Sequence, residues 1–431
     1  MVFGFFKKKD EVKEEDVEVE PVSFLGPLNG NEVNLKANAR LVEAGLMRAK
    51  DLITDALARR ADTIRLEPKG PQAVIQLLID GIPYPGGKVA KAEGLAITQM
   101  VKLLAGLDVK ERKKPQSGGI KAEFDSTPYQ LGVSSVPVAD GERLLIRATN
   151  LKIKLETPTE LGMGDDLRTK LRDLCAGTGL LLTAGPPGSG TTTTAFALLR
   201  NVDAYIFTIF TIGDTQGRKL HHITEFETNE GDDLPTTITR ATRREANVIF
   251  CDPVKDADTV KGLLSKAGEV MLLAEMTAKD TPSALLQLVA WAGNGTAVGE
   301  GLKGIVSQKL IRLLCNECRQ AYRPKADFLK KIGLPEDIPA LYRKPAESPD
   351  PNAEPCEKCG GVGYYGRTAM FEYLEITDGM KELLGGQPDA NAIRAQMKKD
   401  KMVTLQHDGL RLVAEGKTSL EELQRVFKPA G

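Results

Sequence analysis

One glycine-rich segment restricts the fold of this chain more than any other feature of its sequence. Residues 185–191 have the sequence GPPGSGT, follow the apolar run Leu180–Ala184 and precede a stretch expected to be helical, 191–200. A strand, a glycine-rich loop and a helix start in this order direct backbone N–H groups and the partial positive charge of the helix N-terminus toward a phosphate group. The segment fits the pattern G-x-x-x-x-G-K-[ST] except at the lysine, where the chain has Thr191. The pattern indicates a phosphate-binding loop, and a Gly/Pro turn without a ligand is the alternative interpretation.

The segments around this loop alternate between strand-like and helix-like patterns. Apolar runs typical of strands lie at 180–184, 205–212, 248–251 and 270–274, and helical patterns at 191–200, 234–246, 257–266 and 281–291. Strands that alternate with helices form a parallel sheet with helices on both faces. The sequence therefore predicts an α/β core over residues 158–305.

The chain has 431 residues, which is more than a single hydrophobic core usually holds, so we expect further domains outside the α/β core. We expect residues 1–30 to form a flexible charged tail. Between Lys7 and Glu20 basic and acidic residues alternate, and few positions are apolar. Residues 31–157 predict a small α+β domain, with helices at 41–61 and 89–104 and strands at 63–68, 73–80, 130–138 and 142–149. Residues 306–375 hold two cysteine pairs, and residues 376–431 predict short helices.

Charge and hydropathy exclude several classes of protein. The chain has 58 basic and 59 acidic residues, so it lacks the basic excess of a protein that binds nucleic acid over its whole surface. No apolar run approaches the roughly 18–20 residues that cross a bilayer. The N-terminal apolar residues precede the charged ones, which is the wrong order for a secretory signal. We therefore expect a cytoplasmic protein with no nucleic-acid partner.

Four of the six cysteines form two closely spaced pairs. Two residues separate Cys315 from Cys318, two separate Cys356 from Cys359, and residues 319–355 lie between the pairs. Four thiolates with this spacing are typical of a zinc ribbon, and a reducing compartment favours metal over disulfides. Four sulfur ligands leave no open position, so we expect a structural Zn²⁺. The alternative is two turns that merely contain cysteine, whereas Cys175 and Cys251 lie in apolar contexts and are expected in the core.

Ordered motifs over most of the chain resemble one family. They are ADTIRLEP at 61–68, IDG at 79–81, LLAGLDV at 103–109, SSVP at 134–137, GER at 141–143, QKLIRLLC at 308–315 and CGGVGYYGRT at 359–368. Together they resemble the secretion ATPases that drive type II secretion and type IV pilus assembly, from about Asp51 to Phe427. The resemblance implies a RecA-like P-loop NTPase domain behind the small α+β domain, with ATP and Mg²⁺ as ligands. It also implies a hexameric ring whose partners are inner-membrane platform proteins of a secretion or pilus system.

The resemblance assigns roles to individual residues. Nucleotide contacts are implied for Gly185, Pro187, Gly188, Ser189, Gly190, Thr191, Thr192 and Thr193. The hydroxyl of Thr192 is expected to reach magnesium. Catalytic roles are implied for Asp214, after the second core strand, for Asp252, one residue before the expected glutamate, and for Arg147 of the first domain.

The departures from the family pattern all fall on its ATP chemistry. Thr191 replaces the loop lysine, Gly213 replaces an acidic residue, and Pro253 stands where the family has a glutamate. The segment 271–277 lacks the family's histidine, and Gly132 replaces one of two arginines that face nucleotide.

These departures favour nucleotide binding with weak or lost hydrolysis. We expect a structural or regulatory subunit, in a homo-oligomer or in a mixed ring with an active paralogue, peripheral at the inner membrane through its partners. An active hexameric motor is the alternative. A third interpretation, a zinc-ribbon nucleic-acid motor, has no basic run with interleaved aromatic residues to support it.

Overall fold

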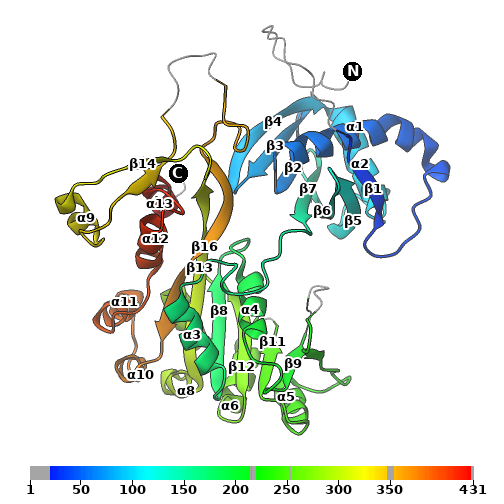
Figure 1. Ribbon diagram of the computed structural model, residues 1–431. Coiled ribbons are helices and arrows are strands. Elements are labelled where there is room, and N and C mark those ends of the chain that lie inside the picture. The colour runs from blue at the N-terminus through cyan, green and yellow to red at the C-terminus, as the bar shows by residue number, and fades with distance from the viewer. Residues whose placement is uncertain (1–19, 214, 216–219, 253, 347–353, 429–431) are drawn as a thin grey trace. The chain divides into compact units, whose positions relative to one another are not determined.

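Two sheets, one in each half of the chain, organise the residues that the computed structural model describes, which are 20–213, 215, 220–252, 254–346 and 354–428. The chain divides into two units at the boundary between Lys154 and Leu155. Each unit has its own sheet (Figure 1), and each has its own hydrophobic core. This confirms the expected order of an α+β unit followed by an α/β unit.

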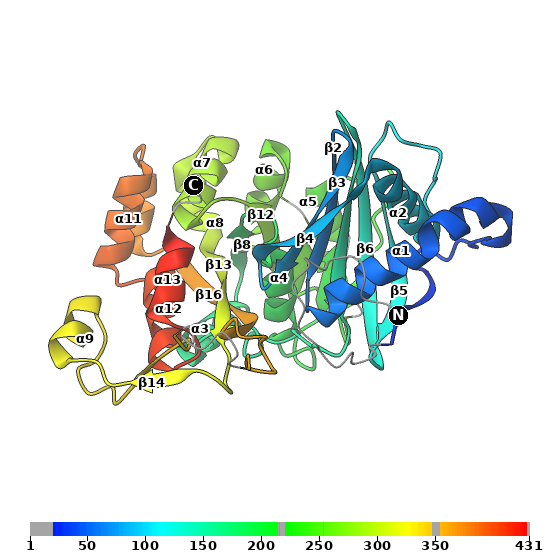
Figure 2. The ribbon, with the colours of Figure 1, turned by 90° about the horizontal axis from the view of Figure 1, so that it is seen from above.

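The first unit is an antiparallel sheet packed against α2 (Lys91–Leu104), which in turn packs against α1 (Ala39–Ala58) (Figure 2). Its strand order is β1-β5-β6-β7-β2-β3-β4. The strands are β1 Ser23–Pro27, β2 Thr63–Lys69, β3 Gln72–Ile79, β4 Ile82–Ala90, β5 Gln116–Phe124, β6 Thr127–Val138 and β7 Gly141–Asn150, and the short helix η1 (Lys36–Asn38) precedes α1. Alternate residues of β2 and β3 are buried, as the period of two along a strand requires.

The structure corrects the expectation for the start of the chain. The expected flexible tail reached residue 30, but β1 pairs with β5 from Ser23 to Pro27, and Val22 is fully buried. The tail prediction is therefore wrong from Val22 onward, and residues 1–19 lie outside the described part.

Two further strands of this unit, β4 and β5, were not anticipated. In β4 the residues Pro83, Pro85, Gly86 and Gly87 hide the strand pattern. The strand forms because it lies at the edge of the sheet, where proline removes no hydrogen bond from a second neighbour.

The second unit contains a seven-stranded sheet with the order β10-β9-β11-β12-β8-β13-β16. Its strands are β8 Gly179–Gly185, β9 Ile209–Ile212, β10 Thr224–Glu225, β11 Val248–Cys251, β12 Met271–Thr277, β13 Leu302–Leu314 and β16 Tyr364–Glu375. All pairs are parallel except β13 with β16. The parallel pairing expected for the core strands is confirmed, and β16 adds one antiparallel strand at an edge of the sheet.

Helices cover both faces of this sheet. Side chains of α3 (Asp165–Leu174) and α4 (Thr191–Arg200) share one core with the sheet. The other core contains side chains of α5 (Leu234–Thr242), α6 (Ala257–Lys266), α7 (Thr281–Ala292) and α8 (Gly295–Gly301). The expected strand at 205–212 is shorter than predicted, because Tyr205 and Ile206 are exposed and β9 begins only at Ile209.

The C-terminal part adds a small ribbon and a run of helices to the second unit. The ribbon pairs β14 (Gln320–Tyr322) with β15 (Leu341–Arg343), and α9 (Ala326–Ile332) lies between them in the chain. The final helices are α10 Asp378–Leu384, α11 Ala390–Lys399, α12 Leu405–Ala414 and α13 Leu420–Phe427, as expected from the sequence. Throughout the described ranges, no helix is both long and apolar enough to cross a bilayer.

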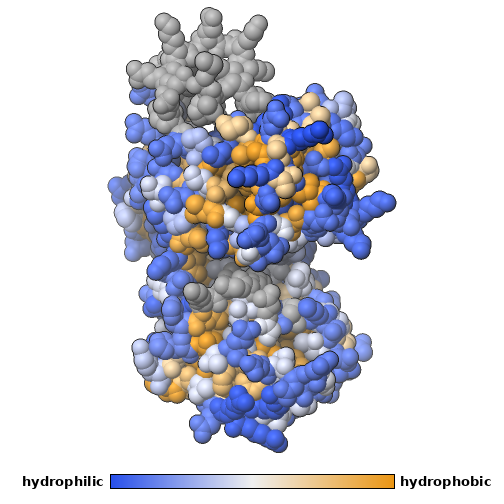
Figure 3. Space-filling model, turned by 90° about the vertical axis from the view of Figure 1, so that its right-hand side faces the viewer, coloured by the Kyte–Doolittle hydropathy of each residue, from blue (hydrophilic) through white to orange (hydrophobic). Residues whose placement is uncertain are grey.

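The first unit also exposes apolar side chains on one face (Figure 3). Its large exposed apolar residues include Leu25, Leu28, Leu35 and Met47.

Candidate functional site

The glycine-rich loop joins the carboxyl end of β8 to the start of α4. Gly188 and Gly190 have φ angles of 80° and 91°, in the left-handed region that favours glycine. A Cβ added to Gly185 would lie only 2.8 Å from Oγ1 of Thr191. The loop can therefore keep this backbone only with glycine at these positions, which gives the geometric setting of a phosphate-binding loop.

Side-chain hydrogen bonds within the loop and from the strand β13 hold the loop in place. Ser189 Oγ and Thr191 Oγ1 lie 2.9 Å apart, so the residue at the lysine position bonds within the loop. Gln308 of β13 is 2% exposed, and its Nε2 donates to the Ser189 carbonyl oxygen at 3.4 Å. The Gln308 contact was missed from the sequence because 119 positions separate the two residues.

Thr192 connects the loop to a carboxylate that sequence reasoning did not select. Its hydroxyl donates to Oε1 of Glu275 at 3.0 Å. Glu275 lies on β12 and pairs in register with Thr183 of β8. The available signal was a single acidic residue near the end of an otherwise apolar strand, in the segment noted only for its missing histidine.

The structure describes Asp252 but not the other acidic candidate. Asp252 directly follows β11, and its N–H donates to the Ile212 carbonyl oxygen at 3.1 Å. Cys251 pairs with Ala274, so Asp252 and Glu275 come one position later on neighbouring strands. Asp214 and Pro253 lie outside the described residues, and their roles stay predictions.

Arg147 lies exposed on β7 of the first unit, where it pairs across the sheet with Gly132 and with Thr63. Arg143, on the same face of β7, bonds to the carboxylate of Glu67 through Nε at 3.1 Å. The bond to Arg143 holds the pKa of Glu67 below its ordinary value. The catalytic role implied for Arg147 stays a prediction.

The four paired cysteines converge on one point. Their sulfur atoms lie within 4.8 Å of one another, with 3.9 Å between Cys315 and Cys356 and 3.6 Å between Cys318 and Cys359. Four sulfurs around one zinc ion at about 2.3 Å are separated by about 3.8 Å, so the cluster has the dimensions of a tetrahedral site. The backbone N–H of Cys359 lowers the pKa of Cys356, whereas burial raises the pKa of Cys318 and that of Cys359. The cluster suggests Zn²⁺.

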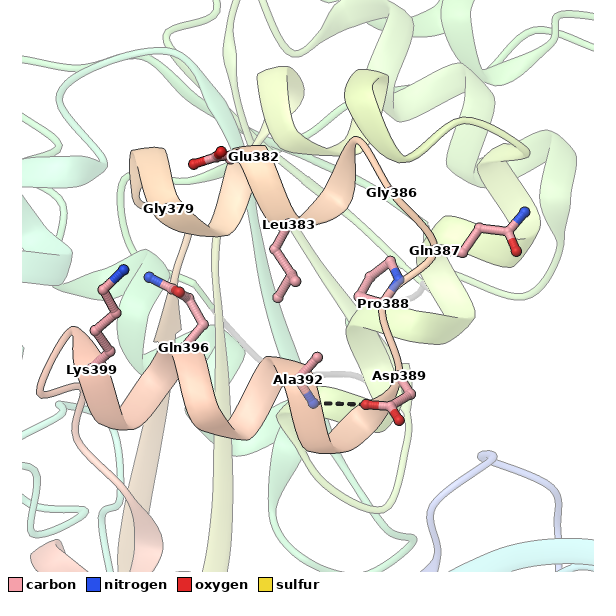
Figure 4. Close-up of a pocket in the computed structure, with 10 residues that line it drawn as sticks. All are labelled: Gly379, Glu382, Leu383, Gly386, Gln387, Pro388, Asp389, Ala392, Gln396 and Lys399. Carbon is pink, nitrogen blue, oxygen red and sulfur yellow. Dashed lines mark hydrogen bonds between the residues drawn. The ribbon is translucent and has the colours of Figure 1, made fainter.

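A separate open groove of about 660 Å³ lies between α10 and α11 (Figure 4). Its lining includes Leu383, Gln396 and Lys399, and Asp389 accepts a hydrogen bond from the N–H of Ala392 at 2.7 Å. No lining residue belongs to the loop 185–193 or to the cysteine cluster, so the groove is a different feature from both.

The fold and the loop define the class of this protein. It is an α/β protein with a phosphate-binding type of loop after a central strand, an antiparallel domain before it and a tetracysteine cluster after it. Residues 41–425 match the family described as "Type II/IV secretion system protein", and the chain belongs to that family.

Several curated relatives are similar over most of the chain. The type IV pilus assembly ATPase PilB of Thermus thermophilus is 26% identical over 87% of this chain, which spans 42% of the PilB length. The type II secretion system protein HxcR of Pseudomonas aeruginosa is 28% identical over 88% of this chain, which spans 76% of HxcR. The chain thus spans less than half of one of these relatives and about three quarters of the other.

Solved structures share the fold. The ATPase DotB of Legionella pneumophila superposes with a TM-score of 0.56 at 14% identity, covering 90% of this chain and 96% of DotB. The pilus retraction motor PilT with bound ADP gives a TM-score of 0.51 at 16% identity, covering 88% of this chain and 96% of PilT. At these identities the likeness is one of fold.

Proposed function

We propose that this protein is a nucleotide-binding member of the type II secretion and type IV pilus assembly ATPases. It acts as a structural or regulatory subunit of a secretion or pilus machine, with weak or lost ATP hydrolysis. One observation carries the proposal: the loop has the backbone of a phosphate-binding loop, while Thr191 occupies the lysine position and bonds to Ser189.

The loop residues fit the phosphates of a nucleotide. Gly188 and Gly190 have no side chains that would keep a phosphate away from the loop backbone. The helix α4 begins at Thr191, so its positive end lies at the loop. A bound magnesium ion would neutralise part of the negative charge of the phosphates. Since the backbone provides much of the phosphate contact, binding survives the loss of the lysine.

Hydrolysis depends more strongly on the missing groups. Removing one preorganised donor to the developing charge lowers turnover by about 10²–10³-fold. The lysine and the glutamate replaced by Pro253 act as one unit, so their losses are not multiplied. Turnover well below that of an intact family motor follows.

We also propose the assembly and the location that the family implies. The protein forms a homo-hexamer or joins a mixed ring with an active paralogue, and it contacts inner-membrane platform proteins from the cytoplasm. Cys315, Cys318, Cys356 and Cys359 hold one structural Zn²⁺ ion, and their mutual distances support this assignment.

A paired binding and hydrolysis assay tests the proposal. The full-length chain is titrated with fluorescent ADP and ATP analogues in magnesium, and phosphate release is followed in parallel. We expect measurable binding with turnover near background. Thr191→Lys should tighten binding without restoring turnover, and Gly190→Val, which disturbs the left-handed loop, should abolish binding.

The opposite results identify which part fails. A brisk wild-type rate would return the protein to the class of active hexameric motors. If the protein binds no nucleotide, the proposal that it is a nucleotide-binding member of the family is wrong.

A further inference from the structure

A carboxylate outside the known motif positions contacts the phosphate loop. β12 lies between β8 and β11 in the sheet, so Glu275 is on the strand directly beside the loop strand. The hydroxyl of Thr192 donates to its Oε1 at 3.0 Å, although 83 positions separate the residues. The acidic positions expected from the family follow β9 and β11, which lie farther from β8 in the strand order.

Glu275 is the one acidic residue of a strand that is otherwise apolar up to Met276. Met271 and Leu273 share a core with α4, and the period of two along the strand gives Glu275 the same face. This face leads to the first turn of α4, where Thr192 lies and where the helix N-terminus favours negative charge. An ionisable residue in such a place is costly unless it is bonded, and the Thr192 hydroxyl provides one bond.

Two of the acidic residues that the resemblance implies are replaced in the sequence, by Gly213 and Pro253. Gly213 has a φ of 111°, and a Cβ added there would lie 2.7 Å from the Asp252 carbonyl oxygen, so the backbone excludes a side chain at this point. Asp252 stays, one position beyond the pair formed by Cys251 and Ala274, with which the pairing of β11 and β12 ends.

We propose that Glu275 provides the carboxylate on the magnesium side of the nucleotide site, together with the hydroxyl of Thr192. In phosphate-loop proteins the loop Ser/Thr and an acidic residue hold the magnesium ion that bridges the phosphates. Magnesium is typically bound by one or two carboxylates and by substrate phosphates. In this chain the hydroxyl and a carboxylate already meet, but the carboxylate comes from β12. The inference rests on the proposed nucleotide binding and deepens it.

The test measures how strongly magnesium promotes nucleotide binding. The dissociation constant of a fluorescent ADP analogue is compared in Mg²⁺ and in EDTA for the full-length chain. Binding of Mn²⁺ in the presence of ADP, followed by the loss of the free-ion electron paramagnetic resonance signal, gives a second readout. Neither measurement depends on hydrolysis.

Glu275→Gln keeps the size of the side chain and an oxygen that accepts from Thr192, and removes only the charge. We expect the affinity in EDTA to be unchanged and the Mn²⁺ affinity to fall by about 10–100-fold. Thr192→Ala should produce a similar loss, and the double variant should lose little more, because the two groups act on one ion. Glu269→Gln is the matched control, since Glu269 is exposed just before the same strand and pairs with Lys266 at 3.0 Å.

Two outcomes overturn the inference but leave the proposed function standing. One is wild-type binding that is equal in Mg²⁺ and EDTA, and the other is a Glu275→Gln variant with unchanged Mn²⁺ affinity. If the wild type binds no nucleotide in either buffer, the proposed function fails and the inference fails with it. Thermal unfolding of each variant separates loss of the ion from loss of the fold, and Thr192→Ala carries the test if Glu275→Gln does not fold.

Discussion

At the scale of a residue, Gly213 stands where the resemblance implies an acidic residue, and its backbone opposes any side chain. Its left-handed φ of 111° and the Asp252 carbonyl oxygen 2.7 Å from an added Cβ both oppose a side chain. We predict that Gly213→Ala lowers the free energy of unfolding by about 1–3 kcal/mol, measured by urea denaturation. Gly177→Ala is the control, because the nearest atom to its added Cβ is 3.6 Å away. Equal stability of the two variants would contradict the prediction.

Lys102 forms a buried ion pair in the first unit. Its Nζ lies 2.7 Å from Oε1 of Glu142, and the two side chains are 0% and 3% exposed. We predict that Lys102→Met destabilises the protein by about 3–5 kcal/mol, because the Glu142 carboxylate is left buried without its cation. The measurement is chemical denaturation against Lys381→Met, which breaks a pair whose side chains are 50% and 101% exposed. If Lys102→Met lowers the free energy of unfolding no more than Lys381→Met does, burial of the Lys102–Glu142 pair does not determine its contribution to stability.

Some residues of the candidate site could be predicted from the sequence and others could not. The loop and Thr191 were predictable, since the motif is continuous in the chain and the structure gives its glycines the left-handed backbone that such a loop needs. Glu275 and Gln308 were not, because their contacts with the loop span 83 and 119 positions. Such contacts follow from strand order and register, which a local pattern does not contain.

At the scale of elements, the cysteine pairs lie beside the long antiparallel pair β13 and β16. Cys315 follows β13, and its N–H donates to the Gly363 carbonyl oxygen at 2.9 Å, just before β16 begins. The segment between the pairs packs Leu329, Leu334 and Leu341 into a core with Met370, Leu412 and Val413, and the cysteine pairs lie at its two ends. A metal ion bound by the four cysteines would join the two ends of this segment and contribute directly to folding.

We predict about one zinc per chain in protein purified without chelator, measured by elemental analysis. Cys356→Ser should lower the zinc content and the thermal midpoint, because three sulfur ligands hold the ion less tightly. Cys175→Ala is the control for a cysteine that lies in the core away from the cluster. A metal-free wild type, or a Cys356→Ser variant of unchanged stability, would count against the zinc site.

The same scale shows why most elements were predictable and some were not. The helices at 191–200 and 257–266 match the expected bounds, since alternating strand and helix patterns are strong signals. β4 was hidden by its prolines and glycines, and β1 by the charged residues before it. Both lie at a sheet edge, where pairing with one neighbour compensates for a weak local pattern.

At the scale of the whole molecule, the prediction concerns assembly. The chain belongs to the Type II/IV secretion system protein family and shares its fold with the PilT motor. The family resemblance implies subunits that contact one another through two different surfaces. Such a heterologous interface closes into a ring when the rotation between subunits permits it.

We predict a ring-forming oligomer, with six subunits expected, whose formation is promoted by nucleotide and magnesium. Light scattering over a concentration series, with and without ADP and Mg²⁺, measures the mass directly. If the exposed Arg147 of β7 faces nucleotide, as the resemblance implies, Arg147→Ala should weaken assembly only when nucleotide is present. Lys121→Ala on β5 is the control, because it removes an exposed charge from another strand of the same sheet. A strict monomer under every condition, also when mixed with an intact paralogue, would leave the ring without support.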